Sequence, residues 1–155
     1  IRTEEVATVN AKLEYITTLT ESVSSSSATS EIDALIDEAR TRITPVDAQI
    51  AVLLLNRIQR TRGGELSDWH RFRIFTNLGA ASLMLGKGEA AAHHFLDAAP
   101  LQPNDELAVA NEVLAYHLLL QEKETREKVR VAVERFTNST RIRSLCTQSA
   151  PPAET

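Results

Sequence analysis

The chain has little of several features that define other classes of protein: one cysteine, five glycines, five prolines and 5% aromatic residues. The single cysteine, Cys146, excludes a framework of internal disulfides and fits a reducing compartment, so we expect a cytoplasmic location. No apolar stretch approaches the roughly 18–20 residues that span a bilayer, so no membrane partner is expected. Runs of β-branched residues are scarce, whereas Ala, Leu, Glu and Arg are plentiful, and this balance favours an all-α fold.

An excess of one charge is also missing from most of the chain. Residues 1–47 carry nine acidic and four basic side chains, whereas the remainder carries twelve acidic and thirteen basic ones. Neither part is basic enough to predict nucleic acid as a partner from charge alone. The first residues, IRTEEVATVN, lack an initiator methionine and do not resemble a signal peptide. We interpret the chain as a segment of a longer protein, in which any catalytic part lies elsewhere.

Composition and periodicity divide the chain into four regions. Residues 1–21 predict an amphipathic helix, because Val6, Val9, Leu13 and Ile16 follow the 3/4 spacing of one helix face and Thr20 continues it. The same spacing also suits a short coiled coil. Residues 22–30 are rich in serine and predict a flexible linker. Residues 31–149 predict a helical domain, and residues 150–155 a tail.

The domain at 31–149 predicts helices joined by short loops, about seven in the whole chain. Thr44 and Pro45 suit the first turn of one helix, and Ser67 suits the N-cap of another. No segment shows the alternation of apolar and polar residues that predicts a strand. The helices are expected at residues 31–42, 44–61, 67–86, 88–99, 105–120 and 124–136, with a last short one from about residue 139.

Small and aromatic residues recur at fixed places between Phe72 and Asp105. Phe75 and Phe95 are the aromatic residues, Leu78 and Gly79 form a Leu-Gly pair, Gly86 lies between two helices, Ala91 and Ala98 are small residues of the second helix, and Pro103 ends the unit. In these positions the segment resembles the tetratricopeptide repeat (TPR), a 34-residue helix-turn-helix unit. Ser82, where the family prefers Tyr, is the clear departure.

Residues 106–139 resemble a second, degenerate TPR unit, with Val113 in place of the glycine and Thr137 in place of the proline. Residues 31–62 form either a further divergent unit or a cap, which terminal repeats usually need. The resemblance implies a right-handed superhelix of antiparallel helix pairs. It also implies that Gly79 and Ala91 let two helices approach closely, so that Gly79→Leu damages the fold by overpacking.

Asn77 and Asn111 are separated by one full repeat and fall on the same position of the two units. The resemblance implies that an asparagine there binds the backbone of an extended peptide, because a carboxamide both donates and accepts hydrogen bonds. The alternative is a surface asparagine bonded to solvent or to a neighbouring helix. The residues expected to line the same face are Arg73, Thr76, Ala80, Leu83, Ala110, Leu114 and His117.

Five arginines cluster around the expected loop at 63–66. They could meet an acidic partner or a phosphate backbone; alternatively they are solvated residues near helix ends, where a cation complements the helix dipole. The cluster consists of Arg57, Arg60, Arg62, Arg71 and Arg73.

Residues with catalytic or metal-binding chemistry do not form a recognisable site. His93 and His94 are adjacent and point about 100° apart on a helix, so they cannot easily bind one ion, and Glu89 and Asp97 are too far apart to complete a site. No phosphate loop, dinucleotide fingerprint or nucleophile elbow is present. We therefore expect no cofactor, no metal and no enzymatic activity.

The sequence thus predicts a non-catalytic module that binds a protein or peptide ligand in the concave face of a TPR-like superhelix. One alternative is a structural role, in which the face is occupied by the N-terminal helix of the same chain or by a second copy, making a homo-oligomer or spacer. Binding of nucleic acid or an acidic partner through the arginine cluster is a third possibility. The first two depend on the family resemblance, since a fold does not specify a function.

Overall fold

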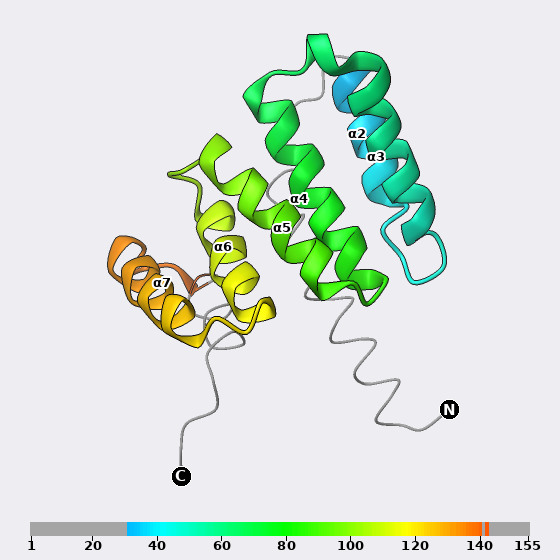
Figure 1. Cartoon of the computed structure of the whole chain (residues 1–155). Helices are drawn as coiled ribbons and strands as arrows, with labels where there is room; N and C mark the ends of the chain where they lie inside the picture. Colours follow the sequence, from blue (N-terminus) through cyan, green and yellow to red (C-terminus); the bar gives the residue numbers. More distant parts are fainter. Residues whose placement is uncertain (1–30, 141, 143–155) are drawn as a thin grey trace.

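The computed structural model of the chain describes residues 31–140 and 142, which are helical and contain no strand (Figure 1). The predicted helix at 1–21, the linker at 22–30, Cys146 and the tail at 150–155 lie outside the described residues. The helices are α2 Glu31–Thr41, α3 Ala48–Arg62, α4 Asp68–Met84, α5 Gly88–Ala98, α6 Glu106–Leu118 and α7 Glu122–Arg135, with short 3₁₀ helices η1 Gly63–Glu65 and η2 Ala99–Leu101.

The helices pack in chain order, each against the next, from α2 to α7 (Figure 1). In addition, α2 contacts α4 directly. The all-α prediction is confirmed for the described residues, which contain six α-helices where about seven were predicted for the whole chain. Short connections between neighbouring helices produce this sequential packing, because a loop of a few residues leaves the next helix no other surface to cover.

The start of α4 follows the local signal in the sequence, whereas α3 begins at Ala48 and not at the predicted Thr44–Pro45. Ser67 is the N-cap of α4: its hydroxyl accepts from the backbone N–H of His70, and Nδ1 of His70 accepts from the backbone N–H of Ser67, both at 3.2 Å. This is a capping box with histidine in the place of the usual Glu or Gln. The hydroxyl of Thr44 accepts from the backbone N–H of Asp47 at 3.0 Å, although α3 proper begins only at Ala48.

The α4–α5 hairpin is held together by a close approach at Gly79. A Cβ atom placed on Gly79 would lie 2.7 Å from Cδ1 of Phe95, well inside van der Waals contact. Phe95 is fully buried in this position, as is Ala91 one turn earlier on α5. Glycine is required at residue 79 because any side chain would occupy the space of the Phe95 ring. The predicted close approach is therefore present.

Candidate functional site

The turn after α4 and the turn after α6 have the same backbone structure. Corresponding residues of the two turns are as far apart in the sequence as Asn77 and Asn111 are. Gly86 and Leu120 both have positive φ, 76° and 58°, two residues after the last residue of their helix. The same three backbone hydrogen bonds close each turn, and corresponding bonds are offset by that same interval. They are Leu85 to Ala81, Gly86 to Leu83 and Lys87 to Ser82 in the first turn, and Leu119 to Ala115, Leu120 to His117 and Gln121 to Tyr116 in the second.

The next helix start repeats with the same period. Asp105 is the N-cap of α6, where its side chain accepts from the backbone N–H of Ala108 at 3.1 Å. Ser139 follows one period later, and its hydroxyl accepts from the backbone N–H of Ile142 at 3.0 Å. The repeat of the sequence is thus also a repeat of the backbone structure. The residues themselves differ: Leu120 replaces the glycine of the first turn, and Ser139 replaces the aspartate of the earlier helix start.

This recurrence places Asn77 and Asn111 at equivalent points of α4 and α6. Their exposed fractions are 0% and 1%, and neither side-chain nitrogen nor oxygen has a hydrogen-bond partner among the described residues. The hydroxyl of Thr76, beside Asn77, is likewise buried and without a partner in this part of the chain. Buried carboxamides normally have partners, since leaving one unpaired costs about 1–3 kcal/mol. These side chains are therefore candidates for binding a ligand.

The other residues expected on this face are mostly buried rather than exposed to solvent. Ala80 and Ala110 are 0% and 1% exposed, and Leu114 and Leu83 are 6% and 9% exposed. Only His117 is half-buried. The structure brings these residues onto the two helices α4 and α6, but the face that they form is not an open groove.

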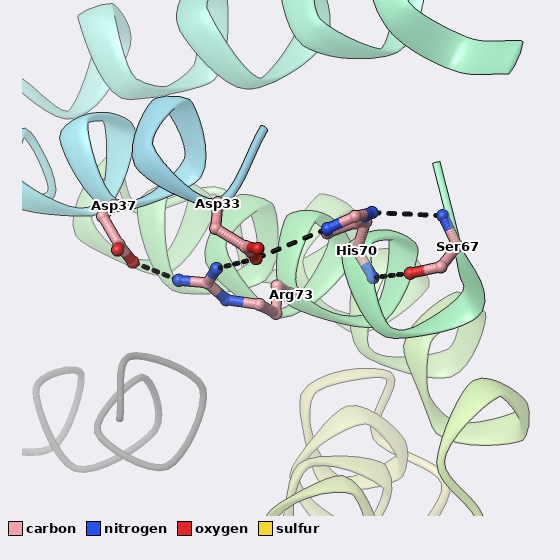
Figure 2. A network of polar contacts seen from close by, with 5 residues as sticks. All are labelled: Asp33, Asp37, Ser67, His70 and Arg73. Atoms are coloured by element: carbon pink, nitrogen blue, oxygen red, sulfur yellow. Dashed lines mark hydrogen bonds and ion pairs between the residues drawn. The ribbon is translucent and has the colours of Figure 1, made fainter. Parts of the chain in front are cut away.

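Arg73, expected both on this face and in the arginine cluster, lies inside the fold. Figure 2 shows its guanidinium between two carboxylates of α2: Nη1 donates to Oδ1 of Asp33 at 3.0 Å, and Nη2 donates to Asp37. Arg73 is 0% exposed. His70 extends the network, with Nε2 3.4 Å from Oδ1 of Asp33 while its other ring nitrogen caps α4. Arg73 thus joins α4 to α2 and is not part of a surface patch.

Two of the remaining four arginines have acidic neighbours. Arg62 lies 3.2 Å from Glu31 and also forms a hydrogen bond with Glu65, which lowers the pKa of that carboxyl group. Arg71 lies 3.6 Å from Asp68. Arg57 and Arg60 are exposed, and the described residues give them no ion pair. The cluster is therefore partly neutralised, which weakens the case for a phosphate-binding surface.

The adjacent histidines of α5 do not form a metal site. His93 lies on the surface with Nε2 3.9 Å from Glu89. His94 is half-buried, and burial lowers its pKa below the ordinary value of 6.5, with His93 adding to the effect and Asp97 opposing it. Among residues 31–140 and 142, no three side chains of His, Cys, Asp or Glu gather as metal ligands would.

A hollow that the sequence did not predict lies between α2 and α3. It has a volume of about 340 Å³ and is lined by three apolar side chains together with polar and charged ones, two of which are arginines. Ile50 and Leu53, on the outer side of α3, are 43% and 60% exposed. The run AVLLL at residues 51–55 was the available signal, because it places leucines around more of the helix than one buried face requires. The lining residues are Leu35, Glu38, Leu54, Arg57, Ile58, Thr61 and Arg62.

Comparisons of the chain with protein-family models, with curated proteins and with solved structures found no match. In the part of the chain that the structure describes, no helix has both the length and the apolar character needed to cross a membrane.

Proposed function

We propose that the chain is a non-catalytic, TPR-like interaction module, whose α4–α6 face binds a peptide or a helix of another protein. The proposal includes a right-handed superhelix of helix pairs and a cytoplasmic location, for which the single cysteine is the support. The recurrence of the turns and helix starts with a constant period supports the repeat. In arrays of stacked helix pairs, equivalent positions form one continuous surface, which suits an elongated ligand.

The observation that carries the proposal is the pair of unpaired, buried carboxamides of Asn77 and Asn111. A carboxamide can donate to a backbone carbonyl and accept from a backbone N–H of the same ligand. Two of them on equivalent helices supply two such attachments along one ligand. An extended peptide suits them better than a helix, because the backbone groups within a helix are already bonded to each other.

The test is selection of random peptides displayed on phage against the full chain. We expect enriched peptides whose binding, measured by fluorescence anisotropy, weakens at least about tenfold in the double variant Asn77→Ala and Asn111→Ala, because each lost hydrogen bond contributes about 0.5–1.5 kcal/mol. Asn56→Ala, an exposed asparagine of α3, is the matched control and should bind as the parent does. No enrichment, or equal binding by the double variant, would refute the proposal.

Self-association is the second candidate, and the exposed apolar residues of α2 and α3 favour it. Leu35, which lines the hollow between these helices, is 37% exposed, and Ile50 and Leu53 of α3 are 43% and 60% exposed. Apolar side chains gathered in this way are typical of an interface between proteins. Sedimentation velocity of the full chain and of Leu53→Glu tests this: a dimer that the substitution dissociates supports it, whereas a monomer at every concentration contradicts it.

A further inference from the structure

The face that carries Asn77 and Asn111 is covered, although it is the face expected to receive a ligand. From Phe72 to Leu83, α4 is buried all round its circumference except at Phe75, which is partly buried. Consecutive residues of a helix point about 100° apart, so burial of an unbroken run means that neighbours surround the helix on every side. The described helices that pack against α4 are α2, α3, α5 and the short 3₁₀ helix η2.

The corresponding part of α6 is covered as well. Between Leu107 and Ala115 every residue of α6 is buried, Asn111 included, except Val109 and Glu112, which are partly buried. Substantial packing against α6 comes from α5 and α7 among the described α-helices. Asn77 and Asn111 hold equivalent positions on α4 and α6, and both are buried without a hydrogen-bond partner among the described residues. Equivalent positions of stacked helix pairs form one surface, so we expect an occupant of that surface to contact both helices.

We propose that residues 3–21 of the same chain occupy this face and that a ligand has to displace them; this inference rests on the proposed function. The segment has an apolar seam of Val6, Val9, Leu13 and Ile16, which suits the small and apolar residues of the face. As a helix the segment would extend about 28 Å, close to the length of about 25 Å that the 17 residues of α4 have.

The connection to α2 brings the segment to the correct place. Residues 22–30 can reach about 30 Å when extended. They lead into α2, which contacts α4 directly, with Asp33 and Asp37 bound to Arg73 (Figure 2). A short flexible linker of this kind holds its two ends at an effective concentration on the order of millimolar. The tethered segment therefore outcompetes a second copy of the chain at ordinary protein concentrations.

The unpaired carboxamides explain how such an occupant remains displaceable. The segment covers the face through apolar contacts and leaves Asn77 and Asn111 without the hydrogen bonds that a ligand backbone would supply. A ligand that satisfies both groups gains interactions that the segment does not make. The segment therefore acts as an internal competitor, which lowers the apparent affinity for every ligand by the fraction of chains in which the face is closed.

The test is the rate at which a thiol on the face reacts with Ellman's reagent in the full-length chain. Ala110→Cys places the thiol on the face, and Cys146→Ser removes the native one. We expect slow reaction in this parent and a rate at least about tenfold higher when Leu13→Asp and Ile16→Asp disrupt the seam, because reaction then no longer requires local opening. Ala11→Asp with Thr18→Asp, on the opposite side of the segment, is the control of equal charge and should stay slow.

Two further thiols check the fold. Leu53→Cys, on the exposed side of α3, should react fast in every background, and Ala91→Cys, inside the α4–α5 hairpin, should stay slow in every background. Leu13→Ser with Ile16→Ser is measured alongside. This milder variant still allows the thiol reaction rates of the seam and control variants to be compared if the aspartates unfold the whole chain. A fast parent, or equal rates in the seam and control variants, overturns the inference. So does a rate in the parent that falls with protein concentration, because a second copy is then the occupant.

The peptides selected against the full chain separate this inference from the proposed function. We expect them to bind the seam variant more tightly than the parent. If the thiol rates do not differ but peptides still bind through Asn77 and Asn111, the self-occupied face is wrong and the binding function stands. If the seam variant opens the face and no peptide binds it, the binding function is wrong.

Discussion

Gly86 and Leu120 hold the same place in the turns that follow α4 and α6, and both adopt the left-handed backbone conformation, with φ of 76° and 58°. Glycine tolerates this region without strain, whereas a leucine loses about 1–2 kcal/mol through contact of its Cβ with the backbone. Leu120 is 85% exposed and contributes little packing in return. The turn geometry therefore persists in the second unit although the residue that favours it is absent.

We predict that Leu120→Gly raises the free energy of unfolding by about 0.5–1 kcal/mol, since relief of strain exceeds the added chain entropy of glycine. The converse change, Gly86→Ala, should lower it by about 1 kcal/mol. Urea denaturation followed by circular dichroism measures both. A destabilised Leu120→Gly variant would mean that residue 120 does not have the strained left-handed backbone conformation that Gly86 adopts in the first turn.

Gly79 supplies a second prediction about stability. Because a Cβ at this position would overlap the ring of Phe95, Gly79→Ala should cost about 1–3 kcal/mol and Gly79→Leu more. Gly88→Ala is the matched control in α5: its Cβ would lie 3.6 Å from Cδ2 of Leu118, an ordinary contact. That variant should be neutral or more stable by up to about 1 kcal/mol, because alanine favours a helix. Thermal melts that rank these variants differently would contradict the packing of the hairpin.

The ion pairs of Arg73 make a third prediction. Asp33→Asn with Asp37→Asn removes both charges next to a guanidinium that is 0% exposed. A buried charge left without its counter-charge costs about 3–5 kcal/mol, so the double variant should be strongly destabilised. Adding Arg73→Met should recover most of that loss, because the unpaired charge is then gone. A triple variant as unstable as the double one would show that the carboxylates do not stabilise the fold by compensating the charge of Arg73.

The local features of this fold were predictable, and the long-range ones were not. The helix start at Ser67 and the close approach at Gly79 depend on residues within one hairpin: a local capping pattern predicts the first, and the resemblance to a repeat unit implies the second. The partners of Arg73 lie 40 and 36 residues away on α2, and no local pattern selects Asp33 and Asp37 from the other acidic residues.

Part of the candidate site was likewise predictable from the sequence, and part was not. The equivalence of Asn77 and Asn111 follows from the period of the sequence, which the turns reproduce. Their burial could not be predicted, because the exposed fraction of a side chain depends on what packs over the whole face. The hollow between α2 and α3 was missed for a related reason: which leucines of α3 are buried depends on how the neighbouring helices cover them, and Leu53 is 60% exposed whereas Leu55 is 0% exposed.

The carboxamides themselves give a prediction about the unliganded chain. Asn77→Ala with Asn111→Ala removes buried polar groups that have no partner among the described residues. Relief of their desolvation cost offsets the lost packing, so we expect the free energy of unfolding to change by less than about 1 kcal/mol. Thr125→Ala is the comparison, because the buried hydroxyl of Thr125 donates to the backbone oxygen of Gln121 at 2.8 Å and its loss should destabilise. Destabilisation of the asparagine variant by several kcal/mol would indicate that the carboxamides are bonded in the free chain.

The last prediction concerns pH and His94. Burial lowers the pKa of His94 in the folded chain below 6.5, so at pH values below 6.5 the unfolded chain binds more protons than the folded one. The stability associated with neutral His94 is therefore fully present above pH 6.5 and is lost as the pH falls below it. We expect a lower urea midpoint at about pH 5.5 than at about pH 7.5, and His94→Gln should reduce that difference. His93→Gln, whose side chain is 63% exposed on the same helix, should keep most of it, because burial is the largest cause of the shift at His94. An equal pH dependence in His94→Gln and the parent would contradict the burial of this imidazole.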